Sequence, residues 1–253
     1  ELRVYNLSSQ QDVIDAAIRH AEQAYNILPE FSKLRNITGA TITSKQYGSK
    51  GSAAALLAHL YAWKGSVAEL YGYSNIDAKA AYEKSVEYAT HLIKGEVGNY
   101  SLVENPEALC QLLSNSSANN PEEIFSIAYD KGRDNEAITK NTVATFFVTW
   151  PVNELKLEGD LAQADYRLHR STVNKLYPDA GDLRRTAFFY KQDEAHMAGG
   201  TDYAVPYKFR KAIYNIDQSS EAGKSFLSLD ANYVYWRLAD ILSLIHISEP
   251  TRQ

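Results

Sequence analysis

The chain has 253 residues, of which 45% are hydrophobic and 23% charged, and its formal net charge at pH 7 is −5. Such a composition is typical of a globular protein that can bury one large core or two small ones. The negative charge and the lack of a long Lys or Arg cluster exclude a surface built to neutralise nucleic-acid or anionic-membrane phosphates. The single cysteine, Cys110, excludes an internal disulfide and, alone, a cysteine metal site.

The first expected helix runs from the Ser9 region to Leu28. Ser9 and Asp12 have the spacing of a capping box, and Pro29 ends the apolar pattern. Its apolar positions recur at helical spacing: Ile14, Ala17, Ile18, Ala21, Tyr25 and Leu28.

Two further helices are expected to form an antiparallel hairpin. The first covers about residues 49–64 and stops at Gly65, and the second is capped by Asp77 and continues until Gly95. The second resembles the second helix of a tetratricopeptide repeat, although the connection is longer than usual. A generic helical hairpin explains the same pattern equally well.

The chain after Pro106 is expected to change in character. Pro106 suits the first position of a short helix through Leu113, after which the chain becomes rich in loops until about residue 232. Within this part the pattern predicts a strand at 123–129, an apolar aromatic run at 143–150, a short helix at 172–177 and extended pieces at 186–191 and 203–210.

The segment from Asn232 to Ile241 predicts an extended aromatic entry into a buried helix. Tyr233 to Trp236 suit a half-buried strand, and a helix with Leu238 and Ile241 on one face is expected to follow. The residues from Leu242 to Gln253 do not continue this face cleanly, so we expect the native helix to be cut short near Ile241.

No catalytic signature survives inspection, and the sequence predicts no enzyme, no metal site and no cofactor. Gly223 to Ser225 is similar to the end of a phosphate loop, but Gln218 stands where the first glycine is needed. The six histidines lack the spacing of a zinc site. The carboxylate pairs Glu122 with Glu123, and Asp160 with Asp165, are interpreted as solvated charges.

Tyrosine is enriched relative to phenylalanine, with 18 residues against 8. A tyrosine ring offers a flat apolar face and a polar tip, which suits a wet surface that holds sugars. A plain preference for tyrosine as the large apolar residue explains the bias about as well.

Several segments, in this order, resemble the SusD/RagB family of glycan-binding outer-membrane lipoproteins of Bacteroidota. The resemblance covers nearly the whole chain to Ile241, and it is carried by residues 11–28, 50–63, 81–102, 122–127, 182–185, 207–209 and 235–241. The element from Asp182 to Arg185, Asp-Leu-Arg-Arg, is interpreted as a buried or semi-buried charge network rather than a sugar site.

The resemblance implies a mainly α fold in which tetratricopeptide-like helical hairpins carry a loop-rich region with short β-strands. One family-like domain fragment is expected over residues 1–241, with its helical scaffold at about 9–113 and its loop-rich part at about 114–232. The implied function is non-enzymatic binding of oligo- or polysaccharide at the outer-membrane surface, for delivery to a SusC-like TonB-dependent transporter. The implied membrane contact is an N-terminal lipid anchor, and Cys110 is not that anchor because it lies inside a predicted helix.

The last residues are interpreted differently. Residues 242–253, which begin Leu-Ser-Leu-Ile-His-Ile-Ser-Glu-Pro, look like the translation of a transposase-type sequencing adapter and are expected to be non-native.

Three residues in or beside predicted loops are candidates for glycan contact: Trp150, Arg133 and Asn135. Trp150 offers a flat ring for a sugar face, and the other two offer hydrogen bonds to hydroxyls. A tetratricopeptide-type scaffold for a peptide partner is the main alternative, and it predicts further helical repeats after Pro121. An all-helical glycoside hydrolase is a third, and it requires a pair of carboxylates about 5 to 9 Å apart in a cleft.

Overall fold

The computed structural model describes residues 7–128, 146–157, 166–194, 202–216 and 223–248. The chain divides into two compact units. Unit 1 comprises residues 1–102, 121–126 and 234–253, and unit 2 comprises residues 103–120 and 127–233. The helix at 106–113 belongs to unit 2 and the last helix belongs to unit 1.

Helix α1 of unit 1 (Gln10–Ile27) confirms the first sequence prediction. The Ser9 hydroxyl accepts a hydrogen bond from the Asp12 backbone N–H, and the Asp12 carboxylate accepts one from the Ser9 backbone N–H, which completes the capping box. The helix ends before Pro29 and buries Ile14, Ile18 and Ala21. A short 3-10 turn, η1 (Phe31–Lys33), follows it.

Helix α2 (Lys50–Tyr71) begins close to the expected start, with Ser49 as its cap, but runs past the expected stop. Gly65 lies inside the helix, where a Cβ atom would come within 2.7 Å of the Tyr82 ring. The residue is therefore a contact point between helices, and the prediction that it ends the helix was wrong. The helix ends at Gly72, which adopts the left-handed conformation with φ of 65°.

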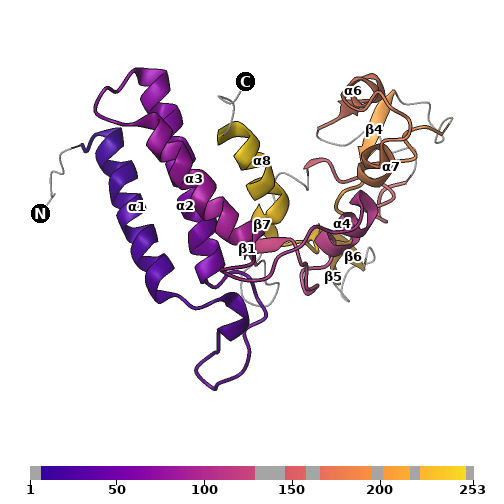
Figure 1. The fold of residues 1–253 in the computed structure, drawn as a ribbon. Coiled ribbons are helices and arrows are strands. Elements are labelled where there is room, and N and C mark those ends of the chain that lie inside the picture. The colour runs from indigo at the N-terminus through magenta and orange to yellow at the C-terminus, as the bar shows by residue number, and fades with distance from the viewer. Residues whose placement is uncertain (1–6, 129–145, 158–165, 195–201, 217–222, 249–253) are drawn as a thin grey trace, which may run out of the picture. The chain divides into compact units, whose positions relative to one another are not determined.

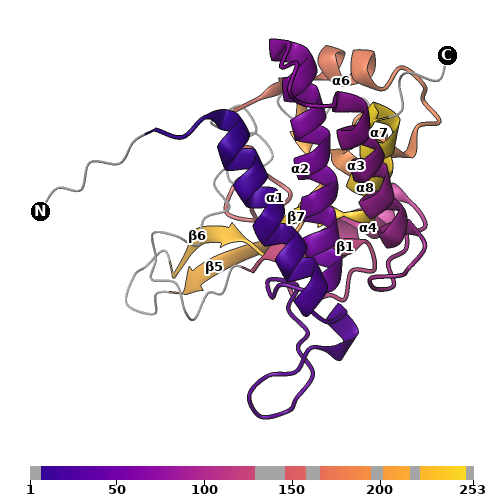
Figure 2. The same cartoon turned by 60° about the vertical axis from the view of Figure 1, so that its left-hand side comes forward.

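Helix α3 (Ala78–Ile93) has the predicted Asp77 cap and packs against α2 as a hairpin. Ser85 is buried and donates a hydrogen bond to the Ala58 carbonyl of α2 at 2.7 Å. Small residues at Ala58 and Ala89, both fully buried, let the two backbones approach closely. Figures 1 and 2 show α1 beside the α2 and α3 pair in both views.

The segment that the sequence predicts as an extended entry into a helix forms the last strand and the last helix of unit 1. Strand β7 (Tyr233–Arg237) pairs with β1 (Glu123–Ile127), and helix α8 (Leu238–Ser248) follows at once. The Asp240 carboxylate accepts the Arg237 backbone N–H at 3.0 Å, and Arg237 also pairs with buried Glu122. These contacts confirm the expected order of extended segment and helix. Glu122 and Glu123 are both buried, so the interpretation of this pair as solvated charges was wrong.

Helix α8 extends past Ile241. It runs to Ser248, and Leu244 is buried in the same cluster as Ile241. The expectation that the apolar face fails after Ile241 was therefore wrong, because Leu238, Ile241 and Leu244 fall on one side of the helix.

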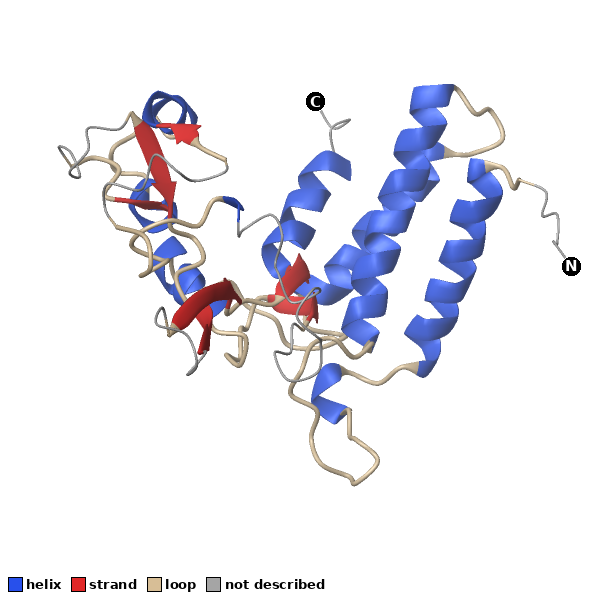
Figure 3. Cartoon of the chain, turned by 180° about the vertical axis from the view of Figure 1, so that it is seen from behind, coloured by secondary structure: helices blue, strands red, loops and turns tan. Residues whose placement is uncertain are grey.

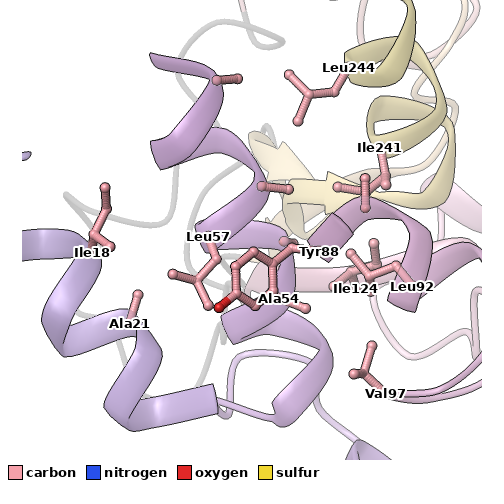
Figure 4. Close-up of a cluster of buried hydrophobic side chains, with 14 of the residues drawn as sticks. Ile18, Ala21, Ala54, Leu57, Tyr88, Leu92, Val97, Ile124, Ile241 and Leu244 are labelled. Carbon is pink, nitrogen blue, oxygen red and sulfur yellow. The ribbon is translucent and has the colours of Figure 1, made fainter. Parts of the chain in front are cut away.

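The core of unit 1 joins all four helices and the end of β1. Figure 4 shows Ile18 and Ala21 of α1, Leu57 of α2, Leu92 of α3 and Ile241 of α8 among its members. Leu57, Leu92 and Ile241 are fully excluded from solvent. Burial of a leucine side chain stabilises a fold by about 1.5–3 kcal/mol, so these positions hold the helices together.

Unit 2 consists of short helices and strands. Its helices are α4 (Pro106–Leu113), α6 (Arg170–Leu176) and α7 (Leu183–Phe188). Its strands are β2 (Leu168–His169), β3 (Phe189–Tyr190), β4 (Tyr203–Pro206), β5 (Ala212–Ile216) and β6 (Lys224–Leu229). Figure 3 distinguishes its short red strands from its short blue helices.

Strand β4 lies between β2 and β3 and pairs with both in antiparallel fashion, with Leu168 opposite Ala204 and Tyr190 opposite Val205. Strands β5 and β6 form a separate antiparallel hairpin with an irregularity after Ile213. Both arrangements connect segments by short ladders rather than by a large sheet.

Several predictions for unit 2 need correction. Residues 183–188 form helix α7 where an extended piece was expected from Thr186, because Asp182 caps the helix through the Arg184 backbone N–H. The extended piece at 203–210 is a strand only to Pro206, and β1 ends at Ile127 rather than at residue 129. The β5–β6 hairpin was not predicted.

The observed fold class agrees with the sequence prediction. The described chain is mainly α, with short β-strands concentrated in the part that the sequence marks as loop-rich. Among the helices that the structure describes, none combines the length and the apolar character needed to cross a bilayer.

Candidate functional site

Trp150, the aromatic candidate from the sequence, lies in an aromatic cluster of unit 2. Its ring meets the Tyr190 ring at a centroid distance of 5.5 Å and an interplanar angle of 88°. Tyr190 in turn contacts Tyr207 at 5.3 Å and 60°. We call Trp150, Tyr190 and Tyr207 the aromatic cluster. All three side chains are partly exposed, which leaves ring surface available for a ligand.

Local structure fixes two of the three rings. Tyr190 is the last residue of β3 and is paired with Val205 of β4, and Tyr207 donates its backbone N–H to the Phe188 carbonyl at 2.7 Å. Trp150 comes from a turn-rich segment instead, beside the buried residue Val152. The cluster thus brings together three segments that are far apart in the sequence.

Two arginines bind the turn that follows Tyr190. Arg170 of α6 donates to the carbonyls of Lys191, Gln192 and Glu194, and Arg185 of α7 pairs with Asp193. Arg185 also donates to the Tyr177 carbonyl and to the Asn174 side chain, and it is only 7% exposed. This arrangement agrees with the interpretation of the Asp182 to Arg185 element as a structural charge network.

Two cations lie over rings of the cluster. The Arg210 guanidinium is 4.3 Å from the Tyr207 centroid, and the Lys191 ammonium is 5.6 Å from the Tyr190 centroid. Contacts of this kind are worth about 0.5–1 kcal/mol at exposed sites. Among the described residues, no Lys or Arg lies over Trp150.

Each of these cations has a carboxylate partner. Glu107 of α4 binds Arg210 through both carboxylate oxygens, and Lys191 pairs with Glu194 at 3.1 Å. The hydrogen bonds from Arg210 lower the pKa of Glu107, so its carboxylate stays ionised into mildly acidic solution.

The other two sequence candidates, Arg133 and Asn135, lie outside the described residues. The sequence reasoning did not propose Tyr190, Tyr207, Arg210 or Glu107 as site residues. The excess of tyrosine pointed to aromatic surfaces in general, but no local pattern joins residues 107, 150, 190, 207 and 210.

The acidic, histidine and cysteine side chains of the described residues bear on whether a metal site is present. Within the described ranges, no group of His, Cys, Asp or Glu side chains is arranged to hold a metal ion. Cys110 is buried in α4, its thiol lies 3.5 Å from the Ala187 carbonyl, and burial raises its pKa. It has the character of a packed apolar residue rather than a nucleophile.

No protein-family profile and no curated protein matches the sequence. Two solved structures do match the fold. A protein crystallised with xylogluco-oligosaccharide aligns with 97% of this chain at a TM-score of 0.63 and 18% identity. A SusD homologue from Bacteroides thetaiotaomicron VPI-5482 aligns with 95% of it at a TM-score of 0.57 and 18% identity.

The chain spans about half the length of the solved chains that it matches, 46% of the first and 47% of the second. At 18% identity the likeness carries the arrangement of the backbone but no residue of a binding site. It agrees with the resemblance seen in the sequence segments. The chain has the SusD-like fold.

Proposed function

We propose that this protein belongs functionally with the SusD-like proteins and binds carbohydrate without catalysing a reaction on it. The observation that carries the proposal is the aromatic cluster around Trp150, in a chain whose fold matches a protein crystallised with an oligosaccharide. A flat ring covers the apolar face of a pyranose, and nearby polar groups bond its hydroxyls.

Trp150 is the proposed stacking ring. It is partly exposed, and Tyr190 supports it edge to face, which limits its rotation. A ring that is already held in place loses little entropy when a sugar stacks on it. Arg133 and Asn135 remain proposed hydrogen-bonding residues on the basis of their side-chain chemistry alone.

The test is a calorimetric titration of the folded chain with a panel of oligosaccharides that includes xylogluco-oligosaccharide. We expect Trp150→Ala to weaken binding roughly tenfold or more, as loss of an aromatic anchor worth about 1.4 kcal/mol predicts. Trp63→Ala is the matched control, because Trp63 is 58% exposed but lies on α2 of unit 1. Circular dichroism verifies that both variants are folded.

Two results would count against the proposal. Failure of the unaltered chain to bind any oligosaccharide of the panel would contradict the proposed carbohydrate binding. Equal affinity of Trp150→Ala and the unaltered chain would remove the aromatic cluster as the binding site.

We further propose that the bound carbohydrate is delivered to a SusC-like TonB-dependent transporter at the cell surface, with a lipid anchor on the complete protein. The support is the SusD-like fold together with the order of the resembling segments. The complete gene provides the test: we expect a lipoprotein signal upstream and an adjacent transporter gene. Their absence would overturn delivery and anchoring but leave carbohydrate binding to be judged by titration.

The alternative of a tetratricopeptide-type peptide scaffold is less well supported. It predicts more helical repeats after Pro121, whereas the described residues beyond that point form short strands and short helices, with the longer α8 only at the end. The hairpin of α2 and α3 is compatible with both functions.

A further inference from the structure

The two cations that lie over rings of the aromatic cluster are each paired with a carboxylate. Arg210 over Tyr207 pairs with Glu107, and Lys191 over Tyr190 pairs with Glu194. Sugar hydroxyls form hydrogen bonds with charged and with neutral groups, whereas a uronate or sulfate group binds most strongly to a cation that has no other anionic partner. These two ion pairs therefore bear on which class of carbohydrate binds beside these rings.

Arg210 is not positioned to leave its partner for a ligand. Its side chain is 15% exposed, and it donates to the Tyr207 carbonyl at 2.9 Å and to the Ala187 carbonyl at 2.8 Å. Its own backbone N–H donates to Ser114 at 2.8 Å. These bonds hold the guanidinium against Tyr207 and keep its geometry independent of any ligand.

Glu107 is the more exposed member of the pair. Its side chain is 51% exposed, compared with 15% for Arg210, so an approaching ligand meets the carboxylate more readily than the guanidinium. Glu107 also lies in the first turn of α4, where a negative charge is favoured by the helix dipole. An anionic sugar near Tyr207 would have to displace this carboxylate or lie beside it.

We propose that the part of the site beside Tyr207 selects uncharged carbohydrate, and that Glu107 is a specificity-determining residue because it occupies the guanidinium of Arg210, which an acidic sugar at that ring would use. The inference rests on the proposed carbohydrate function and names the class of its ligand. It is carried by the bidentate contact between Glu107 and Arg210 and by the pair of Lys191 and Glu194.

The experiment compares two probes of similar length, the uncharged xylogluco-oligosaccharide and an anionic oligogalacturonide. We expect the unaltered chain to bind the first and to bind the second much more weakly. Glu107→Gln exposes the charge of Arg210 while keeping a hydrogen-bonding side chain. It should raise affinity for the oligogalacturonide relative to the neutral probe roughly tenfold at low salt, the size of a charge-assisted hydrogen bond.

Two control variants separate this effect from a change in net charge or shape. Glu87→Gln removes the same charge from α3 of unit 1, where Glu87 pairs with Lys84 at 2.8 Å, and it should leave the affinity ratio unchanged. Glu107→Asp keeps the charge at the site and should keep the preference for the neutral probe. The gain in Glu107→Gln should shrink as salt is added, because exposed charges are screened.

The outcomes distinguish the two proposals. If the unaltered chain binds the oligogalacturonide as tightly as the neutral probe, or if Glu107→Gln leaves the ratio unchanged, selection by Glu107 is overturned while carbohydrate binding stands. If the unaltered chain binds neither probe nor any neutral glycan of the panel, the proposed function itself fails.

Discussion

The helices of unit 1 meet through buried apolar side chains, whereas arginine side chains add many of the connections between the short elements of unit 2. Unit 1 has one apolar cluster that reaches α1, α2, α3, α8 and β1. The apolar cluster between α6, β3 and β4 of unit 2 is small, and its buried residues are Val173, Phe189 and Ala204. Arg170, Arg185 and Arg210 make many of the remaining connections there.

The comparison between apolar helix faces and arginine contacts indicates how a chain can keep irregular segments in place. Helices of 16 to 22 residues present long apolar faces that bury well. A helix of six or seven residues, such as α6 or α7, presents too short a face to hold itself. An arginine can instead satisfy several carbonyl and carboxylate groups at once, which suits a loop-rich region that carries a binding surface.

The largest effect should come from emptying the core of unit 1. Leu92→Ala is expected to lower the free energy of unfolding by about 2–5 kcal/mol, because Leu92 is fully buried and the helices cannot close the cavity. Ile93→Ala, at the next position of α3, is the control, since Ile93 is 40% exposed. Urea unfolding followed by circular dichroism measures both, and equal effects would contradict an apolar core as the main support of unit 1.

A smaller effect should follow from cutting the arginine network of unit 2. Arg185→Met keeps the apolar stem but removes the contacts with Asp193, Asn174 and the Tyr177 carbonyl. We expect faster amide hydrogen exchange in α6, α7 and the turn at 191–194, and unchanged exchange in α2 and α3. Arg184→Met is the matched control, because the Arg184 side chain is 54% exposed and pairs with Asp182 on the surface. Equal rates of amide hydrogen exchange in the two variants would contradict a role of the Arg185 contacts in holding unit 2 together.

The smallest expected effect is a difference in acid sensitivity between the units. In unit 2, hydrogen bonds from Arg184 lower the pKa of Asp182 to about 2, and those from Arg185 and Arg210 lower the pKa values of Asp193 and Glu107. In unit 1, burial raises the pKa of Glu123. A carboxyl with a lowered folded pKa stabilises the fold above its unfolded value of about 4 and loses that contribution as the pH falls further. A carboxyl with a raised folded pKa, such as Glu123, lowers the stability of the fold at neutral pH, and this cost disappears as the pH falls.

Unit 2 should therefore loosen between about pH 4 and pH 2 before unit 1 does, given unfolded carboxyl pKa values of about 4. Residue-resolved hydrogen exchange across this range is the measurement, with Asp193→Asn as the comparison. That variant should show part of the loosening already at neutral pH. Simultaneous loosening of both units at the same pH would argue that the ion pairs of unit 2 contribute little.

The tail of the chain remains a separate proposal. We propose that residues 242–253 derive from a sequencing adapter, and resequencing of the locus tests this. Because Leu244 is buried against the other helices, the natural residue at this position is expected to be apolar. A natural gene that encodes the present tail in frame would overturn the proposal.

The sequence by itself determined the elements whose signals are local. Ser9 and Asp77 cap the two helices that they were expected to cap, because a cap depends on residues within one turn. The order of weak resemblances, from α1 to α8, was also enough to identify the fold. Local signals misled at Gly65, where the absence of a side chain serves a packing contact with Tyr82 instead of a helix end.

Only the tertiary structure decided which distant residues meet. Trp150 was a candidate from the sequence, but its neighbours Tyr190 and Tyr207 are 40 and 57 positions away, and Glu107 reaches Arg210 across 103 positions. No periodicity encodes such contacts, because they follow from how the short helices and strands of unit 2 pack. The fold could therefore be predicted from local sequence signals, whereas the proposed site and its ion pairs depend on long-range packing.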